Sequence, residues 1–171
     1  MSWLNAMNPS SPITTEAEAA RAAKASAISI MIGVVVGLAS LAWTLANPGA
    51  MQDAVATASQ GGAADSTTTQ AALQAGLWMA GGLVLIQAIF AVVQWRSPGK
   101  FIAILFMVLI TFGLVSSLAT PLLAGSVPNM PNTPIWQIAL SVVIMIVQMI
   151  LHVTGLKGIK ALDRIQMEQA R

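Results

Sequence analysis

The chain has 171 residues, of which 56% are hydrophobic and 8% are charged, and its formal net charge is +2. A soluble domain usually carries about 25% charged residues, so a soluble fold of this composition would have too little polar surface to stay dissolved. The chain has no cysteine, which excludes disulfides, a thiolate nucleophile and a cysteine-based metal site. Its cations form no cluster typical of a nucleic-acid-binding surface.

Residues 1–26 are expected to form an N-terminal segment that leads into a membrane. Thr15 and Glu18 have the spacing of a capping box, in which the threonine side chain accepts a backbone hydrogen bond and the glutamate reaches back. The alanine-rich residues that follow predict a helix. A cleaved signal peptide is the alternative, but the long polar stretch with two glutamates before the apolar core favours an uncleaved helix.

Four long apolar segments, none of which contains Asp, Glu, Lys or Arg, lie between residues 27 and 156. They cover about 27–46, 71–95, 101–120 and 135–156. Twenty helical residues rise roughly 30 Å, which matches the hydrocarbon core of a bilayer, and a helix satisfies its own backbone groups there. The segments lack the alternation of barrel strands. The sequence therefore predicts an all-α integral membrane protein, a compact four-transmembrane-helix bundle.

The second and third segments are joined only by RSPGK, residues 96–100. Pro98 and Gly99 break the helix, so a tight helical hairpin is expected. Arg96 and Lys100 would mark the two helix ends at a membrane surface. Trp95 would lie at headgroup level, where an amphipathic ring is favoured.

All eight Lys and Arg residues lie on one side of this predicted topology. They are Arg21, Lys24, Arg96, Lys100, Lys157, Lys160, Arg164 and Arg171. The two longer loops, 47–70 and 121–134, contain none. The positive-inside rule therefore predicts that both termini are cytoplasmic. Residues 157–171 predict a basic amphipathic tail, whose Lys157, Lys160 and Arg164 would lie on anionic headgroups, with docking on a cytosolic partner as the alternative.

The absence of charge inside the helices narrows the function classes. Proton pumps, ion-coupled transporters and intramembrane acid–base enzymes generally need a charged residue in the bilayer, where it is retained mainly for function. The sequence also has no metalloprotease, nucleophile-elbow or phosphate-loop motif. We therefore expect a protein that is not an enzyme.

Small and polar side chains repeat along the helices and are the candidate site residues. Gly33 and Gly37 give a small-xxx-small element in the first helix. The polar candidates at helical spacing are Gln87 and Gln94 in the second helix, and Gln137, Ser141 and Gln148 in the fourth. Two interpretations remain open: these side chains line a polar path, or they hydrogen-bond between helices. The second is favoured, because such bonds are common in membrane proteins.

His152 is the single histidine and lies near the cytoplasmic end of the fourth helix. A neutral imidazole could bind haem iron or chlorophyll magnesium. One histidine provides neither a metal cage nor a bis-histidine haem site, so a hydrogen-bonding role is favoured and no cofactor is expected.

These features predict a non-catalytic accessory, structural or assembly subunit of a larger membrane complex, in contact with the lipid bilayer and other membrane subunits but not with nucleic acid. One alternative is a small-solute transporter or channel that acts as a homo-oligomer. Another is a pigment- or haem-binding subunit that uses His152. The alanine-rich, cysteine-free composition and short loops favour a bacterial inner membrane.

Overall fold

The computed structural model describes residues 3–49, 66–123 and 134–171. The regular secondary structure in these ranges is helical. The helices are α1 (Trp3–Ala6), α2 (Glu16–Ala23), α3 (Ala25–Ala46), α5 (Ser66–Arg96), α6 (Lys100–Leu123) and α7 (Ile135–Gln169). The described part of the chain is therefore all-α, as the sequence predicts.

Four candidate membrane spans are present, which confirms the four apolar helices and supports a multi-pass membrane protein. They are Glu16–Ala46, Gln70–Arg96, Lys100–Leu122 and Ile135–Gln169. The 35 residues of α7 extend about 52 Å at 1.5 Å per residue, well beyond a hydrocarbon core of about 30 Å. The tail at 157–171 thus continues the last apolar helix up to Gln169.

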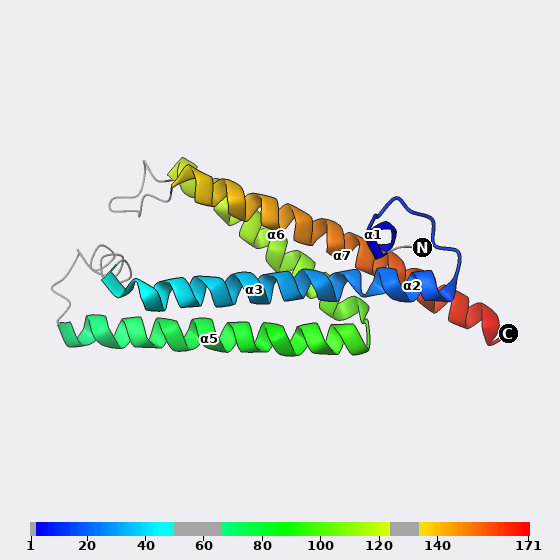
Figure 1. Ribbon diagram of the computed structural model, residues 1–171, viewed down its shortest axis with the longest axis horizontal. Coiled ribbons are helices and arrows are strands. Elements are labelled where there is room, and N and C mark those ends of the chain that lie inside the picture. Colours follow the sequence, from blue (N-terminus) through cyan, green and yellow to red (C-terminus); the bar gives the residue numbers. More distant parts are fainter. Residues whose placement is uncertain (1–2, 50–65, 124–133) are drawn as a thin grey trace.

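The capping box expected at the start of α2 is present. The backbone N–H of Glu18 donates to Thr15 Oγ1 over 3.3 Å, and the Glu18 carboxylate accepts from the backbone N–H of Thr15 over 3.2 Å. These bonds satisfy donors that the first turn of a helix leaves unpaired. Lys24 has right-handed helical backbone angles, so α2 leads directly into α3, and the two run nearly in line in Figure 1.

The four apolar helices pack as two pairs rather than as an even bundle. α5 lies along α3, α6 lies along α7, and α3 also packs on α7 (Figure 1). Although a short turn joins α5 to α6, these two helices make few contacts with each other. Figure 1 shows α6 leaving the turn at an angle to α5. The expected compact bundle is therefore an open arrangement in which α5 and α6 are peripheral.

Small residues explain this pairing, because lipid supplies no hydrophobic drive between helices and close backbone approach takes its place. A Cβ added at Gly37 of α3 would lie 2.7 Å from Cγ2 of Val84 in α5. A Cβ added at Gly113 of α6 would lie 3.3 Å from Sδ of Met145 in α7. Each glycine thus admits a side chain from the other helix of its own pair.

The closest helix crossing joins α7 to the α2–α3 junction. A Cβ at Gly155 would lie 2.6 Å from Cβ of Ser26, and one at Gly158 would overlap the backbone of Ala22 and Ala23. Ala22, Ala23 and Ser26 are all at most 1% exposed. The most tightly packed part of the described molecule is therefore this crossing, near the end where α5 turns into α6.

The turn between α5 and α6 is held by Gln94, which is fully buried. Its Oε1 accepts from the backbone N–H of Gly99 over 3.1 Å, and its Nε2 donates to the Gly99 carbonyl over 3.2 Å. The same Nε2 donates to Ser26 Oγ of α3 over 2.7 Å. Lys24 adds a cation–π contact, with its Nζ 4.9 Å from the centre of the Trp95 ring.

The segment before α2 is bound to α7 by polar side chains of that helix. Thr154 Oγ1 lies 3.1 Å from the Met7 carbonyl and 2.9 Å from the Ile150 carbonyl of its own helix, so its single hydrogen is shared between the two acceptors. Lys157 Nζ donates to the carbonyls of Pro9 and Ser11 over 2.7 and 2.8 Å. Lys157 is half-buried, so its ammonium group is engaged by the N-terminal segment, and its expected contact with lipid headgroups stays a prediction. Lys160, one turn further on, is exposed.

Candidate binding cavity

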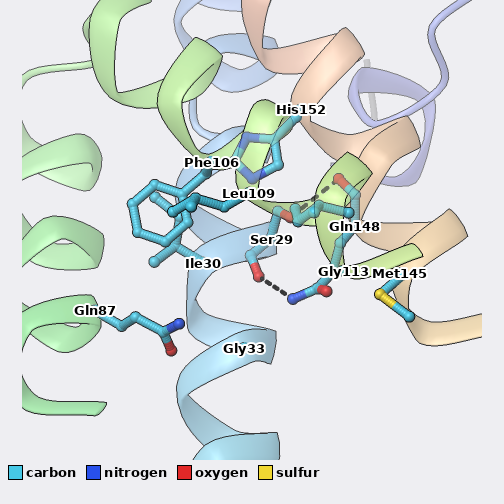
Figure 2. A pocket seen from close by; sticks show the side chains of 11 residues that line it. Ser29, Ile30, Gly33, Gln87, Phe106, Leu109, Gly113, Met145, Gln148 and His152 are labelled. Carbon is cyan, nitrogen blue, oxygen red and sulfur yellow. Dashed lines mark hydrogen bonds between the residues drawn. The ribbon is translucent and has the colours of Figure 1, made fainter. Parts of the chain in front are cut away.

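A cavity of about 220 Å³ lies where the four apolar helices meet (Figure 2). α5 contributes Gln87 to its wall, and α6 contributes a mostly apolar set that includes Phe106. α3 contributes Ser29, Ile30 and Gly33, and α7 contributes Met145, Gln148 and His152. Within the described residues no charged side chain lines it, so the cavity offers hydrogen bonds and apolar surface but no ionic partner.

Ser29 and Gln148 fix one wall by a pair of reciprocal hydrogen bonds between α3 and α7. Ser29 Oγ donates to the Gln148 carbonyl over 3.0 Å, and Gln148 Nε2 donates to the Ser29 carbonyl over 3.1 Å. Both residues are buried. Figure 2 shows these bonds on the side of the cavity opposite Gln87. Gln148 therefore serves helix packing, and its Nε2 is already engaged.

Gln87 reaches the cavity from α5 and lies against Gly33. A Cβ at Gly33 would lie 3.7 Å from Gln87 Oε1 and 3.2 Å from Gln148 Nε2. Gly33 therefore gives both amides room on the surface of α3. The Gln87 side chain is half-buried, and no hydrogen bond joins it to the other residues drawn in Figure 2. Its amide is thus available to a molecule in the cavity.

His152 closes the cavity on the α7 side. Its side chain is 0% exposed, and neither Nδ1 nor Nε2 has a hydrogen-bond partner among the described residues. The imidazole stacks on Phe106, with ring centroids 6.1 Å apart and an interplanar angle of 16°. Phe106 in turn meets the Phe90 ring edge-on at 5.8 Å. The hydrogen-bonding role expected for His152 is therefore not seen among the described residues. Because buried polar groups in native proteins are normally paired, the unpaired imidazole requires an explanation.

The other sequence candidates lie outside this cavity. Gln94 is committed to the α5–α6 turn and to Ser26. Gly37 packs against Val84. Gln137 and Ser141 line a second cavity of about 230 Å³ between α6 and α7, together with Ser117 and Thr120. The structure thus brings Gly33, Gln87, Gln148 and His152 together and separates them from Gln94, Gly37, Gln137 and Ser141.

Phe106 is the cavity residue that the sequence does not point to. It lies in a segment of α6 rich in large apolar residues, and nothing in its spacing distinguishes it from Phe101 or Phe112. The difference is burial: Phe106 is 7% exposed, whereas Phe101 and Phe112 are 76% and 74% exposed. Phe106 is buried because it packs against Ile30 of α3, Phe90 and Ala91 of α5 and His152 of α7.

The described residues contain no group of three or more His, Cys, Asp or Glu side chains that could hold a metal ion. The cavity likewise contains no nucleophile paired with a base. Its chemistry is therefore that of recognition by neutral hydrogen-bonding groups. Comparisons of the chain with protein-family models, with curated proteins and with solved structures give no match.

Proposed function

We propose that this chain is a non-catalytic accessory, structural or assembly subunit of a larger membrane complex. The open arrangement of its helices is the main support. In the most apolar part of α5 only 6% of the residues are buried within the chain, and in α6 only 11%, compared with 28% in the spans that contain α3 and α7. Two helices thus keep most of their surface for contacts outside the chain.

The observation that carries the proposal is a pair of glycines, Gly81 and Gly82, on α5. An added Cβ at either position would meet nothing within 4 Å in the described structure. Gly33, Gly37, Gly113, Gly155 and Gly158 differ, because each would bring an added Cβ against a neighbouring helix. Glycine weakens a helix by up to about 1 kcal/mol relative to alanine, and in membranes it serves close helix approach. Gly81 and Gly82 therefore fit the docking of a helix from another subunit.

Purification in mild detergent, with mass spectrometry of the proteins that accompany the chain, tests this proposal. Gly82→Ile places a branched side chain on the exposed face, so the accompanying subunits should be lost while the chain itself remains folded. Ala72→Ile is the matched control, since Ala72 is also exposed on α5. Retention of the same partners by Gly82→Ile, or recovery of the wild-type chain without membrane partners, would contradict the proposal.

A transporter or channel that acts as a homo-oligomer is the second candidate. Its support is that α6 and α7 border both cavities, the second of which has hydroxyl and amide side chains. An argument against transport is that the amides of Gln94 and Gln148 form hydrogen bonds to α3. Recovery of a lone homo-oligomer, and solute flux in vesicles that Gln137→Leu abolishes, would favour transport over the accessory role.

A pigment- or haem-binding subunit is the third candidate and has the least support. An engineered apolar cavity of about 150 Å³ accommodates one benzene molecule. The cavity beside His152, at about 220 Å³, is therefore close to single-ring size and too small for a four-ring macrocycle. The absorption spectrum of the purified complex tests this candidate, and a visible band that His152→Phe removes would restore it.

The proposal includes a bacterial inner membrane with both termini in the cytoplasm. The eight cations lie in three segments, and Figure 1 places α2, the α5–α6 turn and the C-terminal part of α7 at the same end of the molecule. This agrees with cations gathered on the cytoplasmic leaflet. A C-terminal tag should resist protease added outside spheroplasts and be cleaved in inverted vesicles. Cleavage in intact spheroplasts would contradict this orientation.

A further inference from the structure

The cavity between the four apolar helices is lined by two polar side chains, Gln87 and His152, that make no hydrogen bond with the other lining residues. His152 is fully buried, and both of its ring nitrogens are unpaired within the described structure. Gln87 lines the same cavity, and no hydrogen bond joins it to the other lining residues drawn in Figure 2. An imidazole can always offer one N–H donor and one acceptor when neutral, and the amide can do both. The cavity thus presents hydrogen-bonding capacity that a bound molecule would satisfy.

Gln87 and His152 enter the cavity from different helices and at different levels. Gln87 Oε1 and Gln148 Nε2 both lie beside Gly33. His152 follows Gln148 by four residues on α7, which is roughly one turn or 5–6 Å along the axis. Figure 2 shows Gln87 directed toward Gly33 and His152 on the far side of Phe106. A molecule in the cavity would meet Gln87 directly at one end and would reach His152 at the other end only past Phe106.

The volume and the apolar wall define what fits between these ends. A cavity of about 220 Å³ exceeds the roughly 150 Å³ that admits benzene, so it has room for a single substituted ring. Ile30 and Leu109 supply apolar surface for such a ring. Leu109 is also 53% exposed, so this wall continues to the lipid-facing surface. A hydrocarbon tail on the ring could therefore remain in the bilayer.

The ligand must also be neutral. No charged side chain of the described residues lines the cavity, and an unpaired charge within a bilayer is costly. We propose that the cavity binds the headgroup of a neutral, membrane-soluble molecule with one ring that carries carbonyl or hydroxyl oxygens, the class of quinones and quinols. Gln87 donates from its amide to one oxygen. His152, after its ring turns to bring a nitrogen through the cavity wall, bonds the oxygen at the opposite end.

The single histidine makes a direct test available. In the full-length protein with ¹⁵N-labelled histidine, reconstituted in lipid nanodiscs, the imidazole signals come from His152 alone. Titration with a benzoquinone that carries a ten-carbon chain should shift these signals saturably. Decylbenzene, which has the same tail and a ring without oxygens, should shift them far less. Equal shifts with both compounds, or none with the quinone, would overturn the proposal.

Variants separate specific binding from partition into lipid. Gln87→Leu should raise the dissociation constant of the quinone about fivefold, the effect of losing one hydrogen bond. Gln137→Leu, in the other cavity, should leave it unchanged. His152→Phe keeps a ring against Phe106 and should abolish the binding measured by calorimetry. Unchanged affinity in both Gln87→Leu and His152→Phe would overturn the assignment. This result is independent of the subunit proposal, which concerns the surface at Gly82.

Discussion

Ser29 and Gln148 each donate a hydrogen bond to the other's backbone carbonyl, over 3.0 and 3.1 Å, and so join α3 to α7 from both sides. Each donor is a side chain, and each acceptor is a helix carbonyl that can accept a second bond. The residues are 119 positions apart. These two bonds hold α3 and α7 together beside the cavity. Because both residues also line the cavity, the packing of these helices determines its shape.

Gln148→Leu should weaken the α3–α7 contact. The variant removes the bond from Nε2 to the Ser29 carbonyl and leaves an apolar side chain of similar size, so we expect a loss of about 1 kcal/mol in the free energy of unfolding. Denaturation of the detergent-solubilised protein with sodium dodecyl sulfate measures this loss. Gln137→Leu is the control, because Gln137 is exposed. An equal effect of both variants would show that the Ser29–Gln148 bonds contribute nothing to the free energy of unfolding.

Substitution by alanine should change the free energy of unfolding differently at Gly155 and at Gly82. The Cβ of Gly155→Ala would lie 2.6 Å from Ser26 Cβ, whereas that of Gly82→Ala would have nothing within 4 Å in the described structure. Overpacking typically costs about 1–3 kcal/mol, so Gly155→Ala should lower the free energy of unfolding by this amount. Gly82→Ala should leave it unchanged or raise it slightly. The same denaturation curves test both, and tolerance of Gly155→Ala would contradict the close crossing.

The parts of this fold that the sequence predicts are local in origin. Four apolar segments, the Thr15–Glu18 capping box and the break at Pro98-Gly99 each depend on residues near one another in the chain. A segment that crosses the hydrocarbon core must hydrogen-bond all of its backbone groups, so an apolar segment of this length is expected to form a helix. These predictions hold because no distant contact is needed to decide them.

Helix pairing could not be predicted, because it depends on fit between surfaces distant in sequence. The short turn favours α5 and α6 as neighbours, yet Gly37 with Val84 and Gly113 with Met145 join each helix to a different partner. Lys157 is a similar case. Its position in a basic tail favours lipid headgroups, but the carbonyls of the N-terminal segment lie within its reach.

Gln94→Leu should loosen the turn between α5 and α6. The substitution leaves the Gly99 N–H without its partner and removes the bond to Ser26. Gly99 is half-buried, so its unpaired N–H costs less than the full penalty of about 1–3 kcal/mol for a buried group, and with the lost bond to Ser26 we expect a loss of about 2 kcal/mol in the free energy of unfolding. Trypsin cleavage after Arg96 or Lys100 should become faster as well, although Pro98 and Gly99 remain. An unchanged cleavage rate would contradict the role of Gln94 in holding the turn.

Lys157→Met should release the N-terminal segment from α7. Lys157 Nζ donates to two carbonyls, those of Pro9 and Ser11, and a thioether side chain of similar length cannot replace these bonds. Thr154 still holds Met7, so the loss should be local: hydrogen exchange in residues 8–15 should rise several-fold while α3 and α7 keep their protection. Lys160→Met removes a charge from the same helix at an exposed position and should have no such effect.

Added salt should not reproduce this release, because Lys157 binds carbonyls rather than carboxylates. Salt should instead weaken the ion pair between Lys100 and Asp163, whose side chains are exposed. Equal exchange in the two methionine variants would show that the segment is held by other contacts.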